Sequence, residues 1–560
     1  MHACTSKTTL AVLIALALGA QAAEPQTPES VTGYRGDRNG DYRGCTPPTT
    51  WDEATKKNLA WKTMLPNWCY GLPIVVGQKV LVMSEPGWKS DFPELVCLDL
   101  NTGKILWQKQ VDHLELAVPD AARREKIRAA WASLLARMRL GFSLVAESWD
   151  AGEDAAKQSE VRAKIVAAFG QEAAQRMYGY KVAKHLFGNQ HNGGGYGVLR
   201  GWGNGDYPGP DPKHGVSMKD LRAVGLRLET FYGFGKDREG ECFPAPASDG
   251  KSIYIVTDQG AHACFDLDGN LKWMAWIKPT FNPGGHDDTI CRSPILADGL
   301  FITDLHTGTM PVIALEAKTG REAWRSEVSK EGACHSSKVM DVGGRRYLIS
   351  NSSHVYRVSD GKTVLDLGKT KVGSLHATPE IGCDDASDMI FCYPKAPDGK
   401  GRIFTAVKLR AKGETIEAEV AYRLPEVREH HTMVVHDGKV YLGYGAVDIA
   451  TGKFTDWTGG SKNKRAPTRW LLAVAGGHLY GLDTDGTARV FTLAGKLAAT
   501  NKMLTTTDDP DPMARHAAIW GNRQQWNGIS YSSPFTFAGN HILIRTWDHL
   551  VCFAATAPPN

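Results

Sequence analysis

A short phrase recurs along this chain and restricts the folds that the chain can adopt. It consists of alternating apolar residues, an acidic residue, a turn with glycine, and a tryptophan four residues after that glycine. Each copy predicts a β-strand, a tight turn in which glycine supplies a positive φ, and a second strand. The three clearest copies are Cys97–Trp107, Cys264–Trp273 and Ala314–Trp324.

Weaker copies of the phrase continue toward the C-terminus, one of them with Leu365 in the place of the tryptophan. Upstream of each phrase lies another apolar hairpin, which often turns at Asp-Gly, as in Pro294–Gly299 and Thr432–Gly438. Two consecutive hairpins make one four-stranded unit. The weaker copies are Arg357–Gly361, Ala446–Trp457, Val490–Gly495 and Val551–Phe553.

Eight such units can be counted, and the last of them lacks a fourth strand. The segment Leu59–Thr63 precedes the first unit and has a strand pattern of its own, so we expect it to complete the last sheet and close a ring. The 59 glycines and 16 tryptophans favour an all-β protein with glycine-rich turns. The sequence therefore predicts an all-β, eight-bladed β-propeller. Its units start near residues 71, 243, 292, 335, 376, 431, 470 and 532.

An insertion between the first two units does not follow the repeat. In a propeller, the connection from an outer strand to the next inner strand always emerges on the same face. We therefore expect the insertion to form a lid over the mouth of the central channel, where the inner strands begin. Its helical periodicity covers 119–140, 152–169, 171–187 and 217–229, and a glycine-rich stretch covers 189–209.

The charge balance and the N-terminus bear on partners and compartment. The 65 basic and 61 acidic residues include no Lys/Arg block longer than Lys462–Arg465, which excludes a broad nucleic-acid footprint. Lys7, the apolar run Leu10–Ala20 and the small residues Ala20–Ala22 have the pattern of a signal peptide, and no later run approaches the roughly 20 apolar residues of a membrane span. We expect a periplasmic or extracellular protein. Its expected parts are a signal peptide (1–22), an N-terminal extension (23–57), the closing strand with blade 1 (58–110), the lid (111–241) and blades 2–8 (242–556).

The repeated phrase also has a known relative. The Asp-x-x-Thr-Gly-x-x-x-Trp pattern of Asp99–Trp107 resembles the PQQ-like propeller family, which includes quinoprotein alcohol dehydrogenases and the outer-membrane assembly lipoprotein of the β-barrel machinery. The opening Tyr34–Gly40 resembles the start of secreted relatives in that family. The resemblance covers about 60–110 and 243–555 and implies the propeller fold. It does not select an activity, because members of every activity share the repeated tryptophan.

Alignment of the repeats identifies one position per blade that we expect to face the central channel. It lies six residues before the first residue of each inner turn, and it holds charged and aromatic residues where a core position would be apolar throughout. A neighbouring loop contributes Tyr531 to the same mouth. The equivalent residues are Gly71, Phe243, Arg292, His335, His376 (or its neighbour), His431, Trp470 and Ser532.

Three interpretations of these residues are open. His335, His376 and His431 could hold a divalent metal, because neutral imidazole suits Zn, Mn or Cu. Alternatively, the three histidines could exchange protons with a sugar while Arg292 holds a carboxylate and Tyr531 lies beside them, which would make all five residues catalytic. In the third interpretation the residues line a water-filled channel and have no further role.

The function favoured here is the binding or conversion of a small polar or carbohydrate ligand at a His/Arg-lined axial site under the lid, with metal assistance. A non-catalytic scaffold with a protein partner on a propeller face is the first alternative, and a PQQ-dependent dehydrogenase is the second. The dehydrogenase is less favoured, because the chain lacks the adjacent cysteine pair that those enzymes carry over the quinone and has no Cys-x-x-Cys-His haem site. The sequence leaves open whether the chain is an enzyme and which cofactor it holds.

The cysteines fall into two groups. Cys97, Cys264 and Cys552 occupy the same repeat position, where other blades have Ala or Val, so we expect small buried core residues. In an oxidising compartment two bridges are conceivable, because disulfides persist there. The candidate pairs are Cys383 with Cys392 and Cys45 with Cys69.

Overall fold

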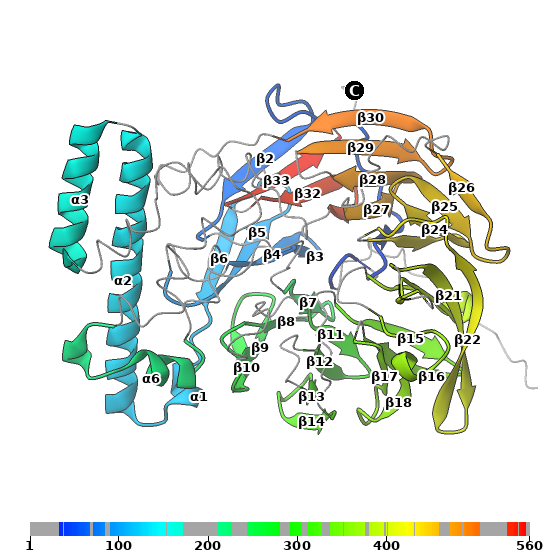
Figure 1. The fold of residues 1–560 in the computed structure, drawn as a ribbon, viewed down its shortest axis with the longest axis horizontal. Coiled ribbons are helices and arrows are strands. Elements are labelled where there is room, and N and C mark those ends of the chain that lie inside the picture. The colour runs from blue at the N-terminus through cyan, green and yellow to red at the C-terminus, as the bar shows by residue number, and fades with distance from the viewer. Residues whose placement is uncertain are drawn as a thin grey trace, which may run out of the picture.

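A computed structural model of the chain shows an eight-bladed β-propeller with a helical insertion between blades 1 and 2 (Figure 1). Seven blades are sheets of four strands and blade 7 has a fifth, and the predicted fold is confirmed. The structure describes residues 33–36, 38–67, 71–84, 90–152, 154–171, 210–226, 244–279, 292–304, 311–327, 336–350, 352–375, 380–396, 399, 401–430, 432–457, 471–482, 486–503, 535–546 and 548–555.

The first four blades follow one another along the chain, and each one is an antiparallel meander from the axis to the rim. Blade 1 contains β3 (Ile74–Val76), β4 (Lys79–Ser84), β5 (Glu94–Asp99) and β6 (Ile105–Gln110). Blade 2 contains β7 (Ala247–Ser248), β8 (Ser252–Val256), β9 (Ala261–Asp266) and β10 (Leu271–Trp276). Blade 3 contains β11 (Ile295–Ala297), β12 (Leu300–Asp304), β13 (Val312–Glu316) and β14 (Glu322–Arg325). Blade 4 contains β15 (Lys338–Val342), β16 (Arg345–Ile349), β17 (His354–Arg357) and β18 (Thr363–Asp366).

The remaining blades complete the ring, and β2 (Leu59–Met64) supplies the outer strand of blade 8 by pairing antiparallel with β33. The closing role predicted for Leu59–Thr63 is therefore confirmed. Blade 5 contains β19 (Gly382–Asp384), β20 (Met389–Cys392), β21 (Phe404–Lys412) and β22 (Thr415–Leu424). Blade 6 contains β23 (Val434–His436), β24 (Lys439–Leu442), β25 (Gly445–Asp448) and β26 (Phe454–Asp456). Blade 7 contains β27 (Leu471–Ala475), β28 (His478–Leu482), β29 (Thr487–Thr492) and β30 (Leu497–Lys502); blade 8 contains β31 (Thr536–Ala538), β32 (His541–Arg545), β33 (His549–Ala554) and β2.

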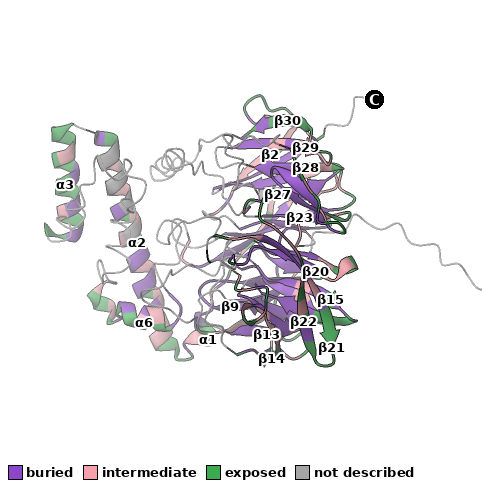
Figure 2. Ribbon diagram, turned by 45° about the vertical axis from the view of Figure 1, so that its right-hand side comes forward, coloured by how far each residue is buried: buried purple, intermediate pink, exposed green. Residues whose placement is uncertain are grey.

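Burial decreases from the middle of each blade to its rim (Figure 2). In blade 1, β5 is buried at five consecutive residues, whereas the outer strand β6 alternates between intermediate and exposed residues. This difference follows from stacking, because both faces of a middle strand lie against neighbouring blades. A continuous apolar run such as Leu95–Leu98 therefore marks a middle strand in this chain.

The repeated Gly and Trp explain each other, because they form a contact between successive blades. The tryptophan of one blade covers the turn glycine of the next. The indole N–H of Trp61, Trp273 and Trp324 also donates to a nearby carbonyl, as in Trp273 Nε1 to Ala317 O at 2.9 Å. A Cβ on these glycines would lie 2.3 to 2.9 Å from the ring, so no other residue fits there. The pairs are Trp61 with Gly103, Trp107 with Gly269, Trp273 with Gly320, Trp324 with Gly361 and Trp457 with Gly495.

The contact between blades 4 and 5 is built differently. Blade 4 has Leu365 in the place of the tryptophan, and blade 5 replaces the short turn with the long β21–β22 hairpin, which reaches past its neighbours (Figure 1). At the tip of this hairpin Glu414 accepts hydrogen bonds from Arg345 and Arg357 of blade 4. Ile416 is buried in a core shared by the two blades. The hairpin therefore takes over the packing that the Trp–Gly pair provides elsewhere.

The helical insertion stands beside the propeller as a hairpin of two long helices (Figures 1 and 2). The first helix of this hairpin, α2 (Ala121–Ala151), continues through Gly141 to Ala151. It therefore passes its predicted end at Leu140, because no proline interrupts it. No described helix has the length and apolar character needed to cross a membrane. The helical elements here are α1 (Leu114–Ala117), α2 (Ala121–Ala151), α3 (Ala155–Phe169), η1 (Pro212–His214) and α6 (Met218–Ala223); blades 4 and 5 add η3 (Leu367–Lys369) and η4 (Asp385–Ser387).

Polar contacts attach α2 to blade 1, and a ring stack before α1 attaches the insertion to blade 2. The Trp131 indole donates to Asp91 O at 2.7 Å, and Arg139 donates to Ser90 O at 2.9 Å, both in the β4–β5 loop of blade 1. Just before α1, the buried ring of His113 stacks on Trp276 of β10 in blade 2. These described helices therefore contact the loops and the outer strand of blades 1 and 2. A lid over the mouth stays a prediction, because residues 172–209 and 227–243 lie outside the described residues.

The structure confirms the prediction for the core cysteines and contradicts one of the two proposed disulfides. Cys97, Cys264 and Cys552 are buried free thiols, as expected for small core residues. The Cys383–Cys392 bridge is wrong: Cys383 lies opposite Ile390 in the β19–β20 hairpin, and Cys392 is a free thiol. Cys45 is also free, and its proposed partner Cys69 lies outside the described residues.

Candidate functional site

Of the five residues predicted to form the axial site, the structure describes one, Arg292. Arg292 precedes the inner strand of blade 3, at the mouth, and its side chain is almost fully buried. It forms an ion pair with Asp304, the last residue of β12. The other predicted residues, His335, His376, His431 and Tyr531, lie outside the described residues, so their roles stay predictions.

Arg292 belongs to a polar network between blades 3 and 4. Its partner Asp304 also accepts hydrogen bonds from Ser337 and, at 3.0 Å, from Ser350 Oγ. The ion pair and both hydrogen bonds end on the same oxygen, Asp304 Oδ2, and the hydrogen bonds offset part of the cost of burying the pair. In this structure Arg292 therefore holds a carboxylate of its own blade, where the sequence predicted a carboxylate of a ligand.

The axis itself is filled by a part of the chain that the sequence placed in an N-terminal extension. Residues 33–36 and 38–42 run along the inner strands from the mouth to the opposite face, and β1 (Asp41–Tyr42) pairs parallel with β27 as a fifth strand of blade 7. At the opposite face Arg43 contacts Asp437 in the inner turn of blade 6. The described residues of Gly33–Tyr42 (33–36 and 38–42), called the axial segment below, therefore lie on the axis between the inner strands.

Arg35 is the main anchor of the axial segment. Its guanidinium contacts Glu380 of blade 5 and donates to Leu472 O of blade 7 at 2.7 Å and to Met433 O of blade 6 at 3.2 Å. The second oxygen of Glu380 accepts from Lys338 Nζ of blade 4 at 2.7 Å. Arg35 and Lys338 are 2% exposed and Glu380 is fully buried, so this is a charge network taken out of water.

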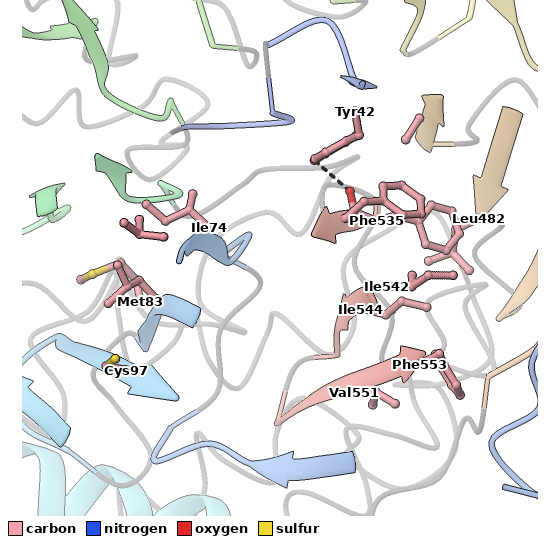
Figure 3. Packing of buried hydrophobic residues seen from close by; sticks show 14 of the residues in the cluster. Tyr42, Ile74, Met83, Cys97, Leu482, Phe535, Ile542, Ile544, Val551 and Phe553 are labelled. Atoms are coloured by element: carbon pink, nitrogen blue, oxygen red, sulfur yellow. Dashed lines mark hydrogen bonds between the residues drawn. The ribbon is translucent and has the colours of Figure 1, made fainter. Parts of the chain in front are cut away.

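Further side chains of the axial segment contact other blades. The Asn39 carboxamide pairs with the backbone of Cys383, donating to its O at 3.1 Å and accepting from its N at 3.3 Å. Asp41 lies 2.9 Å from His436 Nδ1, and the Tyr42 hydroxyl donates to Phe535 O at 3.1 Å (Figure 3). Tyr34 packs in an apolar cluster with Leu72 and Ala245 of blades 1 and 2.

Turns give the axial segment its compact shape. Arg35 has a φ of 53°, an unusual value for a residue with a side chain, and Arg35 O accepts from the amides of Arg38 and Gly40. A Cβ on Gly40 would lie 2.4 Å from the Arg35 guanidinium. Gly40 is therefore required for the path of the Arg35 side chain.

The axial segment continues into the core between blades 7, 8, 1 and 2. Tyr42 packs edge-on against Phe537 with ring centroids 5.0 Å apart. Trp51 follows, and its ring lies among Tyr480, Phe535 and Phe553. Figure 3 shows Tyr42 and Phe535 beside the strands of blade 8. This core joins the axis to the seam where the ring closes.

Burial holds two titratable groups on the third strands of their blades in the neutral form. His262 on β9 is fully buried, its Nε2 lies 3.2 Å from Thr303 Oγ1, and burial lowers its pKa to about 4. Burial likewise raises the pKa of Tyr356 above its usual range. Among the residues that the structure describes, no group of three or more His, Cys, Asp or Glu side chains is placed to hold a metal ion.

Sequence comparison supports the repeat. Residues 232–372, which span blades 2 to 4, match the family described as outer membrane protein assembly factor BamB. Residues 232–372 therefore carry repeats of the PQQ-like propeller type. The match covers about a quarter of the chain, and no curated protein matches it.

The solved structures that match this chain are distant from it. BamB from Moraxella catarrhalis is 12% identical, with 57% of this chain and 95% of that chain covered and a TM-score of 0.32. A europium-containing methanol dehydrogenase is 10% identical, with 95% of this chain and 99% of that chain covered and a TM-score of 0.41. Scores this low carry no argument, so the fold assignment depends on the strand pairing described above.

The part of the axis that the structure describes does not fit a quinone cofactor. A planar quinone there would have to share the channel with the axial segment, whose Arg35 is buried against Glu380. The chain also has no adjacent cysteine pair to lie over such a ring. We therefore derive no step through PQQ.

Proposed function

We propose that this chain is an exported, non-catalytic propeller scaffold that binds a protein partner. The observation that carries the proposal is the filled axis: the axial segment occupies the place where a propeller enzyme would hold its reacting groups. The described charges along the axis are paired with one another, as in Arg35–Glu380–Lys338 and Arg292–Asp304. A rigid body of this kind offers its loop faces for binding, and the matching family is described as an assembly factor.

The compartment is part of the same proposal. The pattern of residues 1–22 supports export through a signal peptide to the periplasm or the extracellular space. N-terminal sequencing of the mature protein tests it, and a first residue near Ala23 is the expected result.

Cross-linking in the source cells, followed by mass spectrometry, tests the scaffold. A scaffold gives the same cross-linked protein with the wild type and with the triple variant His335→Ala, His376→Ala, His431→Ala, because the partner touches loop faces. Loss of that protein in the triple variant, with folding unchanged by circular dichroism, would contradict the proposal.

A second candidate is the binding of a small polar or carbohydrate ligand at the mouth, with metal assistance. It is favoured by Arg292, Lys338 and Glu380, which place charged groups at the mouth ends of three consecutive inner strands. His335 and His376 lie shortly before two of these residues in the sequence. In that case the axial segment would form the bottom of a binding pocket that opens at the mouth.

Elemental analysis and calorimetry separate the two candidates. A metal-assisted site predicts one divalent ion per chain after purification, and it predicts that the triple histidine variant and chelation both remove that ion and the binding of acidic sugars. A protein without bound metal that gives no heat with such sugars supports the scaffold instead.

A further inference from the structure

The axial segment makes its contacts as a ligand does, through side chains that enter sites on distant parts of the chain. Arg35 reaches residues of blades 5, 6 and 7, and Asn39 reaches blade 5. Tyr34 adds blades 1 and 2, and Tyr42, which pairs with β27 of blade 7, adds blade 8. One short segment therefore contacts six of the eight blades.

We propose that the inner faces of blades 5, 6 and 7 form a peptide-binding site, and that the axial segment is its ligand, bound in cis. The chemical class of the ligand is a turn-forming peptide with a buried arginine and a carboxamide four residues later. Arg35 and Asn39 fill these two positions here.

The topology separates this segment from the fold that holds it. Blade 7 has its four strands β27–β30 without β1, and β2 closes the ring from a later part of the chain. Between the axial segment and β2, Arg43 and Gly44 are exposed on the face opposite the mouth. The segment can therefore be cut from the propeller at this point without breaking a blade.

The arginine site selects a guanidinium by its geometry. Glu380 contacts one terminal nitrogen, while two backbone carbonyls accept from the other, Leu472 O at 2.7 Å and Met433 O at 3.2 Å. A planar fork reaches all three acceptors at once, whereas a lysine ammonium at the end of a flexible stem does not reproduce this arrangement. Lys338 already occupies the other carboxylate oxygen, so the site has room for one further cation.

The carboxamide site imitates backbone pairing. Asn39 presents one acceptor and one donor to the N–H and C=O of Cys383, as a neighbouring strand would. This contact lies on the free inner edge of β19. It fixes the register of the turn between Arg35 and Gly40 relative to blade 5.

A cut and exchange experiment on the full chain tests the proposal. A specific protease site is inserted between Arg43 and Gly44, and the folded protein is cleaved. The released N-terminal fragment should stay bound during gel filtration. A fluorescent synthetic peptide of residues 33–43 should then replace it slowly, and fluorescence anisotropy should measure the exchange.

Peptide variants identify the arginine that matters, while the protein itself stays unchanged and folded. The Arg35→Ala peptide should bind at least about 100-fold more weakly, because it leaves Glu380 buried opposite an empty site. The affinity of the Arg35→Lys peptide should lie between the affinities of the wild-type and Arg35→Ala peptides. The Arg43→Ala peptide removes the same charge from a side chain that is 61% exposed, so it should bind within about threefold of the wild type.

Two results would overturn the proposal. One is equal binding of the Arg35→Ala and Arg43→Ala peptides. The other is that the N-terminal fragment dissociates after cleavage and the wild-type peptide then fails to bind to the folded remainder of the protein. Gel filtration of the cleaved complex as a monomer confirms binding in cis, and a dimer would show that the site takes the segment of a second copy instead.

Discussion

The Trp–Gly contact between blades gives a prediction that can be worked out from coordinates. In blade 3, Gly320 has a φ of 73°, and a Cβ built on it would lie 2.4 Å from Trp273 Cε3. Gly299 in the inner turn of the same blade has a φ of 74°, and a Cβ there would have no neighbour within 4 Å. Gly299→Ala is therefore a matched control, because it carries the backbone strain without the clash.

The expected losses differ by the contribution of the ring. Alanine in the left-handed region costs about 1–2 kcal/mol, and this cost applies to both variants. Gly320→Ala adds the overpacking of a partly buried ring, which costs about 1–3 kcal/mol more. The ring cannot move away freely, because Trp273 also packs against Phe301 and donates to Ala317 O at 2.9 Å.

Urea denaturation followed by far-UV circular dichroism measures both variants. We expect the midpoint of Gly320→Ala to fall clearly below that of Gly299→Ala. In a Trp273→Leu background, which copies the Leu365 of blade 4, the extra loss should disappear. Equal losses for the two glycine variants in the wild-type background would refute the contact as the reason for the repeat.

Two further predictions concern buried charge and pH. Glu380→Gln leaves Arg35 and Lys338 without their shared carboxylate and should cost about 3–5 kcal/mol in urea denaturation, whereas Glu316→Gln at the surface should change the midpoint little; equal midpoints would contradict the buried network. His262 has a pKa of about 4 when folded, below its ordinary value of 6.5, so its neutral form contributes stability that is present above pH 6.5 and lost as the pH falls toward 4. The loss should be about 2 kcal/mol at pH 5 and absent in His262→Gln, and an identical pH profile for that variant would show that another group titrates.

The sequence was sufficient to predict the ring. The Gly–Trp spacing in phrases such as Cys264–Trp273 reports a local contact between neighbouring blades, so its periodicity counts the blades. The unpaired strand pattern of Leu59–Thr63 likewise predicted the closing strand. Both signals are visible because each depends on a few adjacent residues.

The filling of the axis could not be predicted in this way. Arg35 meets Glu380, which lies 345 residues further along the chain, and nothing in either local sequence indicates the pairing. The expectation that a polar axial position must serve a ligand overlooked this partner within the chain. One signal was available: Tyr34–Gly40 combines Tyr, Arg and Asn with two glycines in a segment that was otherwise assigned to an extension.

The most direct test of the filled axis is limited trypsin digestion of the folded full-length protein, with the cleavage sites identified by mass spectrometry. Arg35 is 2% exposed, whereas the Arg43 side chain is 61% exposed. The axial position of residues 33–42 predicts cleavage after Arg43 under conditions in which the bond after Arg35 stays intact. Cleavage after Arg35 at the rate seen after Arg43 would contradict a segment buried in the channel.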